Sequence, residues 1–329
     1  DLFLISSKTT HASIHNLLPS DHIYNLDIAI TAEGGNYKLL REYGRVRKII
    51  NEIKPDIINP HYITSHGFLA ALVKKFNRTR FVLVQSAWGS DILVTPFQNK
   101  IYRQITRFCL KMADIATSDS MHMTEVLGSI YPVTTLTFSF GLDELPPYHP
   151  SEKNNHLYYS NRMLSANYNI DEVIRFFSRI AAHDHEARLI IAHDGTERQS
   201  LKSLVQDLRL EDRVTFMGFI DEKEQELNYR KARFYISIPT SDATSVSLLE
   251  AMAYGCVPIV SDIPANREWI TEGENGIYYK SGKTGFDEIS MALVKQELFV
   301  GRNREIIKKR AIFPDAIKNY VEQLKNMFM

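Results

Sequence analysis

Residues 237–262 decide the fold of this chain, and they read SIPTSDATSVSLLEAMAYGCVPIVSD. The apolar start is typical of a buried strand, and a loop of small residues follows it. A helix is expected to begin near Val246 and to end before Gly255, and a second apolar strand comes next. Strand, loop, helix and strand in this order predict one βαβ unit of a parallel sheet.

The loop of this unit carries candidate ligand-binding chemistry. The N–H groups at the start of the helix near Val246 favour a diphosphate. The small residues 243–245 allow a ligand to approach the backbone closely. Glu250, one turn into the helix, offers two oxygen acceptors to a pair of ribose hydroxyls, and Asp242 precedes the loop. In the simpler interpretation Asp242 or Ser245 caps the helix and Glu250 is a solvated side chain.

Short apolar runs alternate with amphipathic stretches along the rest of the chain. They predict an α/β protein with a first domain at 1–145, a proline-rich linker at 146–155, a second domain at 156–310 and a C-terminal helix in 311–329. The expected strands are 2–6, 24–29, 56–59, 81–86, 115–118 and 134–139, then 156–160, 188–193, 213–217, 234–238, 257–261 and 276–279. The expected helices are 43–53, 67–76, 100–112 and 121–127, then 171–182, 197–208, 222–231, 246–254, 286–300 and 314–327. Ligands of such sheets bind at the carboxyl ends of the strands, so a site between the two domains is expected.

Composition excludes several classes of protein. The 329 residues hold 39 Lys and Arg and 39 Asp and Glu, and this balance argues against a protein whose main partner is nucleic acid. Cys109 and Cys256 lie in apolar segments and are expected to be reduced thiols, which favours a cytoplasmic location. No apolar run approaches the ~20 residues of a membrane span. The start lacks the basic head of a signal peptide and reads as a buried strand, with a few natural residues expected before it.

Residues 237–276 resemble the donor-site signature of retaining GT-B glycosyltransferases, family 4 in particular. That signature consists of an acid, seven residues and a glutamate, which here are Asp242 and Glu250. The LEAMA run at 249–253, with Gly255 and Pro258 after it, also matches. The next loop and the EGENG turn at 272–276 continue the resemblance.

The resemblance covers most of the chain. It includes IAHDGTE at 191–197, DRVTFMGF at 212–219, FGLD at 140–143, HY at 61–62 and SAWGSD at 86–91. The two N-terminal motifs resemble a subgroup that mostly builds bacterial surface polysaccharides. The resemblance implies a GT-B fold, in which two Rossmann-like doubly wound domains face a central cleft and the C-terminal helix packs back on the first domain.

The resemblance also implies roles for individual residues. Asp242 would contact hydroxyls of the donor sugar, and Glu250 would contact the ribose. The amides of Val246 and Ser247 would hold the distal phosphate. Arg162, which matches an arginine of the family's G-R-L motif, would be a fixed cation on the leaving diphosphate.

Further residues are assigned to the donor site by the same resemblance. They are Ser245, Thr244, Gly218, Phe219, Asp194 and Trp88. His61 and His66 follow the strand at 56–59, where one of them would touch the donor sugar or act near the acceptor, and the alternative is a loop histidine with satisfied hydrogen bonds. Trp88 would stack on a sugar or pack between loops. The loop at 33–36 reads either as an acceptor loop or as a plain turn.

The chain departs from the family pattern in ways that keep other functions open. Asp242 is one methylene shorter than the usual glutamate, and residues 165–169 lack the family's lysine. Asp194 and Gly195 follow His193 where the family has G-D-G, and Trp88 replaces a usual histidine. These departures motivate a second hypothesis, a catalytically weak GT-B partner or binding subunit. A GT-B sugar-nucleotide epimerase is a third, which the acid–glutamate spacing disfavours.

The function expected from the sequence is therefore transfer of a hexose-type sugar from a nucleotide diphosphate donor to a hydroxyl of a glycan or lipid-linked acceptor. UDP is favoured over GDP because it is more frequent in the family. No D-x-D follows a strand, so neither a metal nor another cofactor is expected. A basic cluster at Lys74, Lys75, Arg78 and Arg80 fits either peripheral contact with the cytoplasmic membrane face or a solvated helix end.

Overall fold

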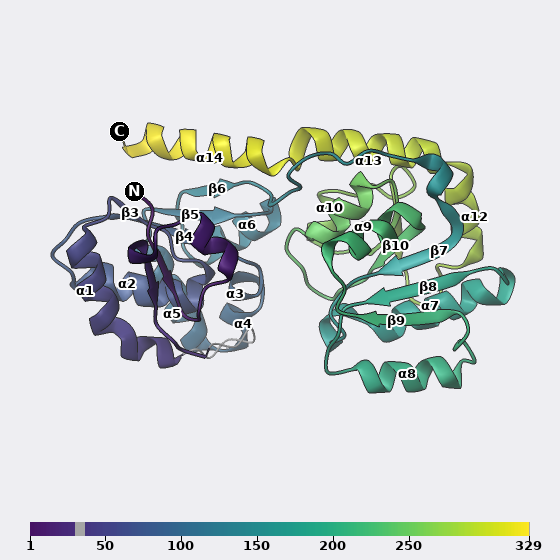
Figure 1. Ribbon diagram of the computed structural model, residues 1–329, viewed down its shortest axis with the longest axis horizontal. Helices are drawn as coiled ribbons and strands as arrows, with labels where there is room; N and C mark the ends of the chain where they lie inside the picture. Colours follow the sequence, from purple (N-terminus) through teal and green to yellow (C-terminus); the bar gives the residue numbers. More distant parts are fainter. Residues whose placement is uncertain (30–36, 329) are drawn as a thin grey trace. The chain divides into compact units, whose positions relative to one another are not determined.

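The computed structural model describes residues 1–29 and 37–328 (Figure 1). The chain divides into two compact units, Asp1–Thr137 and Phe138–Met329. In each unit short parallel strands alternate with helices, so the predicted α/β class is confirmed.

The first unit contains a four-stranded parallel sheet in the order β3-β4-β5-β6. Its strands are β3 (Ile57–Ile58), β4 (Val82–Ser86), β5 (Ile115–Ser118) and β6 (Thr135–Thr137). Its helices are α1 (Tyr43–Ile53), α2 (Gly67–Phe76), α3 (Ser90–Leu93), α4 (Thr95–Gln98), α5 (Lys100–Met112) and α6 (Met121–Ile130). The strands β4 and β5 are almost fully buried, as continuous apolar runs in a parallel sheet require.

Within the part of the chain that the structure describes, the first two strands of this unit pair only with each other. β1 (Leu4–Ser6) and β2 (Ile23–Asn25) form a separate two-stranded parallel sheet. The described strands of the first unit are thus divided between two sheets rather than joined in one doubly wound sheet. The hydroxyl of Ser7, just after β1, lies 3.2 Å from Nε2 of His66. This contact connects the end of β1 to the π-helical turn Tyr62–His66 that leads into α2.

The second unit is built on a six-stranded parallel sheet in the order β12-β11-β10-β7-β8-β9. Its strands are β7 (Asn154–Ser160), β8 (Arg188–Ala192), β9 (Val214–Gly218), β10 (Ala232–Ser237), β11 (Val257–Ser261) and β12 (Ile277–Tyr279). Its helices are α7 (Ile170–His183), α8 (Arg198–Asp207), α9 (Glu222–Lys231), α10 (Val246–Ala253), α11 (Pro264–Arg267), α12 (Phe286–Val294), α13 (Gln296–Arg310) and α14 (Phe313–Phe328). The second unit starts at β7 in the middle of the sheet. It adds β8 and β9 on one side, and then β10, β11 and β12 on the other. This is the doubly wound arrangement.

Both faces of this sheet are covered by helices (Figure 1). On one face Tyr158 and Phe234 belong to a core shared with α7, α8 and α12. On the other face Tyr159 and Tyr235 belong to a core shared with α9, α10 and α13. Successive side chains of a strand point to opposite faces, so neighbouring tyrosines in the same strand serve different cores.

The segment after β6 differs from the predicted domain boundary at 145 and linker at 146–155. The structure assigns residues from Phe138 onward to the second unit. Leu142 donates its N–H to the carbonyl of Ala311 at 2.9 Å, and its own carbonyl accepts from the N–H of Phe313 at 2.8 Å. A Cβ on Gly141 would lie 1.9 Å from the oxygen of Ala311, so only glycine permits this close approach. The segment around Leu142 is therefore hydrogen-bonded to the backbone at the junction between α13 and α14.

The predicted helix at 286–300 is wrong in its extent. It ends at Val294, and α13 begins at Gln296 after a break at Lys295. The last predicted helix, at 314–327, corresponds to α14. Phe138 and Phe140 contact α14 through ring pairs with Tyr320 and Phe313 at 4.9 and 5.9 Å. Packing of this helix on the first domain stays a prediction. Among the described residues, no helix combines the length and the apolar character that a membrane span needs.

Candidate functional site

The candidate site lies where the strand order of the second unit reverses. β7 and β10 are neighbours in the sheet but far apart in the chain, and the helices after them lie on opposite faces. Arg162 follows β7, and the loop that begins at Asp242 follows β10. Ligands of doubly wound sheets bind outside the carboxyl ends of the strands at this switch point. The fold thus brings together two segments that the sequence analysis assigned separately.

Arg162 occupies the centre of this site. Its Nη2 donates to Oδ2 of Asp242 at 2.6 Å. Its Nη1 donates to Oγ of Ser247 at 2.8 Å and to the hydroxyl of Ser245. The side chain of Arg162 is 11% exposed and that of Asp242 is 16% exposed, so the pair is screened only weakly by solvent. A guanidinium held by three partners is fixed in position before any ligand binds.

The charge of Arg162 is also stabilised by its surroundings. The guanidinium carbon lies 4.5 Å from the ring centre of Tyr168. Burial is the largest single effect on the pKa of Arg162 and lowers it, but the carboxylate of Asp242 together with Tyr235 and Tyr168 raises the pKa by more, so that the net shift is upward. Burial raises the pKa of Asp242, and Arg162 works in the opposite direction. Arg162 is therefore a permanent cation, and its charge favours the ionised form of Asp242.

The loop after β10 and the start of α10 form an N-terminal cap. Ser245 is the N-cap residue, and its hydroxyl accepts from the N–H of Leu248 at 3.3 Å. The capping interpretation is therefore correct for Ser245. It does not exclude a binding role, because the first N–H groups of a helix, here those of Val246 and Ser247, have no partner within the helix. Thr244 is buried beside them.

Glu250 of α10 is held by two side chains of the neighbouring helix α9. Its Oε2 accepts from the hydroxyl of Tyr229 at 2.8 Å and from Nε2 of Gln225 at 3.2 Å, both on α9. Burial raises the pKa of Glu250, and the bond from Tyr229 opposes this shift. Glu250 is thus no solvated surface side chain, contrary to the simpler interpretation of the sequence.

A buried polar network joins Glu250 to the Arg162 pair. Asn161 donates to the hydroxyl of Tyr229 at 2.8 Å and accepts from the hydroxyl of Tyr235 at 2.9 Å. The hydroxyl of Tyr235 also lies 2.9 Å from Oγ of Ser247. Sequence reasoning missed Tyr229, Tyr235 and Asn161. Tyr235 and Asn161 are a polar group in, or just after, an apolar strand, which is common, and Tyr229 is one aromatic residue in the strongly polar helix α9, so none of the three has a distinctive local signal.

The exits of β8 and β9 supply the remaining predicted residues of this unit. Asp194 pairs with Nη1 of Arg198 at 2.5 Å. Its carbonyl accepts from the N–H of Leu164, which connects it to the Arg162 loop. Gly218 adopts a φ of 73°, and Phe219 after it is exposed and packs beside the ring of His193 at 4.7 Å. These residues lie at the same edge of the sheet as Arg162.

The predicted residues of the first unit form their own cluster. Nε1 of Trp88 donates to Nδ1 of His61 at 3.1 Å, and the two rings are 5.5 Å apart. Trp88 is 45% exposed. Burial lowers the pKa of His61, and it also lowers that of His66. The structure brings His61 and Trp88 together, whereas their relation to Arg162 stays a prediction. The loop at 33–36 lies outside the described residues.

Asp91 holds this cluster in place, although the sequence analysis gave it no role. It is completely buried. Its Oδ1 accepts from the N–H of Trp88 at 3.0 Å, and its Oδ2 accepts from the N–H of Ile63 at 2.8 Å. Burial raises its pKa from 3.8 to about 6 against the effect of these bonds. One carboxyl group therefore connects the 61–63 and 88–91 segments.

The raised pKa of Asp91 predicts a pH-dependent stability. The folded state keeps the proton up to about pH 6, and the unfolded chain releases it near 3.8. The contribution of Asp91 to the free energy of unfolding therefore falls as pH rises through this window, by ~3 kcal/mol at most. We expect the stability of wild type relative to Asp91→Asn to fall by that order between about pH 4 and about pH 7. Urea unfolding across this range measures it, with Glu125→Gln as an exposed control. A constant difference would contradict the expectation.

The position of the family's lysine has a structural substitute rather than a second cation. Asn167 donates to the carbonyl of Ser241 at 3.0 Å and accepts from the hydroxyl of Thr240 at 2.8 Å. It thereby ties the Arg162 loop to the loop after β10, while Tyr168 covers the guanidinium. Among residues 1–29 and 37–328, no group of three or more His, Cys, Asp or Glu is arranged to hold a metal ion.

Two family models match most of the chain. The family model for glycosyl transferases group 1 matches residues 143–311, which contain Arg162, Asp242 and Glu250. The model described as glycosyl transferase 4-like matches residues 1–120.

Two curated relatives illustrate the range of similarity. The N-acetyl-alpha-D-glucosaminyl L-malate synthase of Bacillus anthracis is 25% identical over 74% of this chain and 66% of its own length. The alpha-monoglucosyldiacylglycerol synthase of Streptococcus pneumoniae is 32% identical over 34% of this chain and 25% of its own length. The chain thus spans between a quarter and two thirds of these relatives.

A solved structure resembles nearly the whole chain. HepE from Anabaena, crystallised in complex with UDP, has a TM-score of 0.77 at 16% sequence identity. The match covers 96% of this chain and 90% of that protein. At this identity the likeness shows the fold alone, and that fold is the GT-B fold of glycosyltransferases.

Proposed function

We propose that this chain, which belongs to the glycosyl transferases group 1 family, is a retaining glycosyltransferase that moves a hexose-type sugar from a UDP-sugar to a hydroxyl acceptor. The observation that carries the proposal is the fixed Arg162 guanidinium beside the N-terminus of α10, at the switch point of the sheet. A buried cation and a helix N-terminus together suit a diphosphate. Glu250, one turn further along, suits a ribose.

The mechanism follows from where negative charge develops. Charge builds up on the distal phosphate as the glycosidic bond of the donor breaks. Arg162 and the amides of Val246 and Ser247 are positioned to stabilise this charge, which is usually the largest contribution to catalysis. Asp242, which orients Arg162, would also contact hydroxyls of the donor sugar. The acceptor hydroxyl then attacks from the same face and passes its proton to the leaving phosphate.

Three points support the finer parts of this proposal. HepE was crystallised in complex with UDP, which favours a uridine donor. Both curated relatives have alpha in their names, and an alpha product from an alpha-linked donor means retention. The SAWGSD motif resembles enzymes of surface-polysaccharide synthesis, so the acceptor proposed is a glycan or a lipid-linked glycan. We place His61 near the donor sugar or the acceptor, and we place the protein at the cytoplasmic face of the membrane.

A thermal shift assay without added metal tests the donor site. A ligand that binds only the folded state stabilises it by ~2.7 kcal/mol at a hundredfold excess over its dissociation constant. We expect UDP and a UDP-sugar to raise the melting temperature, and we expect GDP and ADP to have little effect. If none of the three nucleotides raises it, the transferase proposal fails and the partner-subunit hypothesis gains support.

The stereochemical proposal has a separate test. Once a UDP-sugar and an acceptor give product, anomeric NMR of that product distinguishes the two outcomes. An alpha product supports retention, and a beta product excludes it. Conversion of the UDP-sugar to its epimer without any acceptor would instead support the epimerase hypothesis.

A further inference from the structure

The first unit exposes large apolar side chains on α4 and α5. Phe97 is 53% exposed and Ile101 is 71% exposed. Ile105 and Phe108 follow Ile101 at helical spacing and are half-buried, while Leu110 on the opposite face is buried. Ile101, Ile105 and Phe108 line a shallow groove of about 390 Å³ together with Phe68 of α2. The exposed side of α5 thus carries large apolar side chains, where a helix on the surface of a soluble domain normally has polar ones.

The charge of this region has a single sign. Residues 67–112 contain eight lysines and arginines and only one acid, Asp91, which is completely buried. Four of the eight are on α5, which has no acid at all. They are Lys100, Arg103, Arg107 and Lys111, and each is exposed. Since the whole chain has balanced charge, this surface concentrates a positive excess.

Basic side chains of this surface lie close to its aromatic rings. The guanidinium of Arg103 is 5.8 Å from the ring centre of Phe97. The ammonium of Lys75 is 5.4 Å from the ring centre of Phe108 and 5.3 Å from that of Phe76. Long basic side chains beside aromatic groups are typical of surfaces that meet lipid headgroups. By contrast, Lys74 of the basic cluster expected from the sequence pairs with Asp114.

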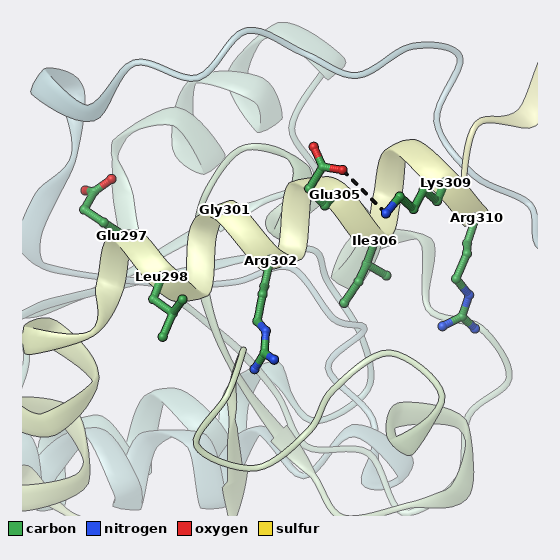
Figure 2. Close-up of a pocket in the computed structure, with 8 residues that line it drawn as sticks. All are labelled: Glu297, Leu298, Gly301, Arg302, Glu305, Ile306, Lys309 and Arg310. Atoms are coloured by element: carbon green, nitrogen blue, oxygen red, sulfur yellow. Dashed lines mark ion pairs between the residues drawn. The ribbon is translucent and has the colours of Figure 1, made fainter.

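A second exposed groove of the chain lacks this charge pattern. It runs along α13 and is lined by apolar Leu298 and Ile306 among residues of both signs (Figure 2). Glu305 pairs with Lys309 at 3.8 Å, as the dashed line in Figure 2 shows, and Arg302 pairs with Glu274 at 2.7 Å. Its charges are balanced locally, so the groove on α13 serves as an internal control.

We propose that the α4–α5 surface, defined by Phe97, Ile101, Arg103 and Arg107, docks on a membrane rich in anionic phospholipid. The basic side chains would meet phosphate headgroups, and Phe97 and Ile101 would enter the boundary between headgroups and acyl chains. Membrane docking itself does not depend on the proposed function. Only its purpose does, which is to bring a lipid-linked acceptor within reach. The proposed surface shares Lys75 with the basic cluster at the end of α2, but it is centred on α4 and α5.

Vesicle sedimentation tests this surface directly. The probes are vesicles of phosphatidylcholine alone and vesicles of phosphatidylcholine and phosphatidylglycerol in equal parts. We expect wild type to sediment only with the anionic vesicles, and we expect salt to weaken the binding. Arg103→Glu/Arg107→Glu should reduce the partition coefficient by at least about tenfold, since each basic residue near the membrane adds roughly fivefold. Ile101→Ser should weaken binding that persists in high salt.

Matched variants on α13 control for unspecific effects. Lys308→Glu/Lys309→Glu makes the same charge change on another exposed helix, and Leu298→Ser removes an apolar side chain that is 59% exposed. Both should bind vesicles as wild type does. Equal binding to neutral and anionic vesicles would overturn the proposal, and so would equal losses in the α5 and α13 variants.

The UDP thermal shift separates this inference from the proposed function. All four variants should keep it, because none changes the Arg162 site. Vesicle binding without a UDP shift would leave the surface standing and refute the transferase proposal. A UDP shift without vesicle binding would support the donor site and refute the membrane-docking surface.

Discussion

Replacing Arg162 with alanine is expected to lower the rate of sugar transfer by about 10²–10³-fold. The physical reason is that Arg162 is a fixed cation aimed at the position where the leaving diphosphate gains charge. Its hydrogen bonds to Asp242 and Ser247 hold it there before the reaction, at 2.6 and 2.8 Å. UDP release from the UDP-sugar that stabilises wild type measures the effect. The loss should appear mainly in kcat, because the charge is greatest in the transition state.

If the role of Arg162 were purely structural, the rate and the melting temperature would be lost and recovered together. Removing it leaves the carboxylate of Asp242 without its partner, and breaking a buried pair destabilises a protein by about 3–5 kcal/mol. Arg162→Ala/Asp242→Asn removes that unpaired charge and should restore most of the melting temperature without restoring the rate. Arg162→Lys keeps a cation and should lie in between. Arg175→Ala, on the exposed side of α7, should behave as wild type. Full activity of Arg162→Ala would refute the mechanism.

Replacing Glu250 with alanine is expected to weaken UDP binding by about 10–100-fold and to abolish the UDP thermal shift. A hydrogen bond to a charged group contributes about 1.5–3 kcal/mol net, so the loss of one bond between a ribose hydroxyl and the carboxylate already accounts for a change of this size. Isothermal titration of UDP measures the change. Glu224→Ala is the matched control, because Glu224 is an exposed glutamate on the neighbouring helix α9. Unchanged UDP affinity in Glu250→Ala would remove the ribose assignment.

The raised pKa of Glu250 adds a pH dependence to this prediction. Burial holds its pKa above the ordinary value of 4.5. The ionised carboxylate accepts two hydroxyls, and the protonated form accepts fewer. UDP affinity should therefore fall as pH is lowered toward this raised pKa, and Glu250→Gln should bind weakly without that fall. An equal pH dependence in wild type and Glu250→Gln would assign the titration to another group.

The elements that the sequence predicted well are those with a strong local period. Helices Tyr43–Ile53, Gly67–Phe76 and Lys100–Met112 have the bounds that their apolar spacing indicated, and so does β11. The helix predicted at 286–300 failed because Lys295 turns the chain without a proline or glycine to mark the break. The pairing of β1 only with β2 also has no local signal, since register and partner choice depend on residues far along the chain.

Sequence alone determined that this chain alternates strands and helices, that two α/β units follow one another, and that Asp242 and Glu250 flank a helix N-terminus. Each of these rests on patterns within about twenty residues, where local periodicity and capping act. The tertiary structure decided how Arg162 meets residues some eighty positions away, and how Tyr229, Tyr235 and Asn161 join Glu250 to that site. It also decided that Asp91 is buried between two loops and that α5 exposes apolar Ile101 beside its basic side chains. Such contacts depend on strand order in the sheet, because only the pairing of β7 with β10 brings these side chains within hydrogen-bonding distance.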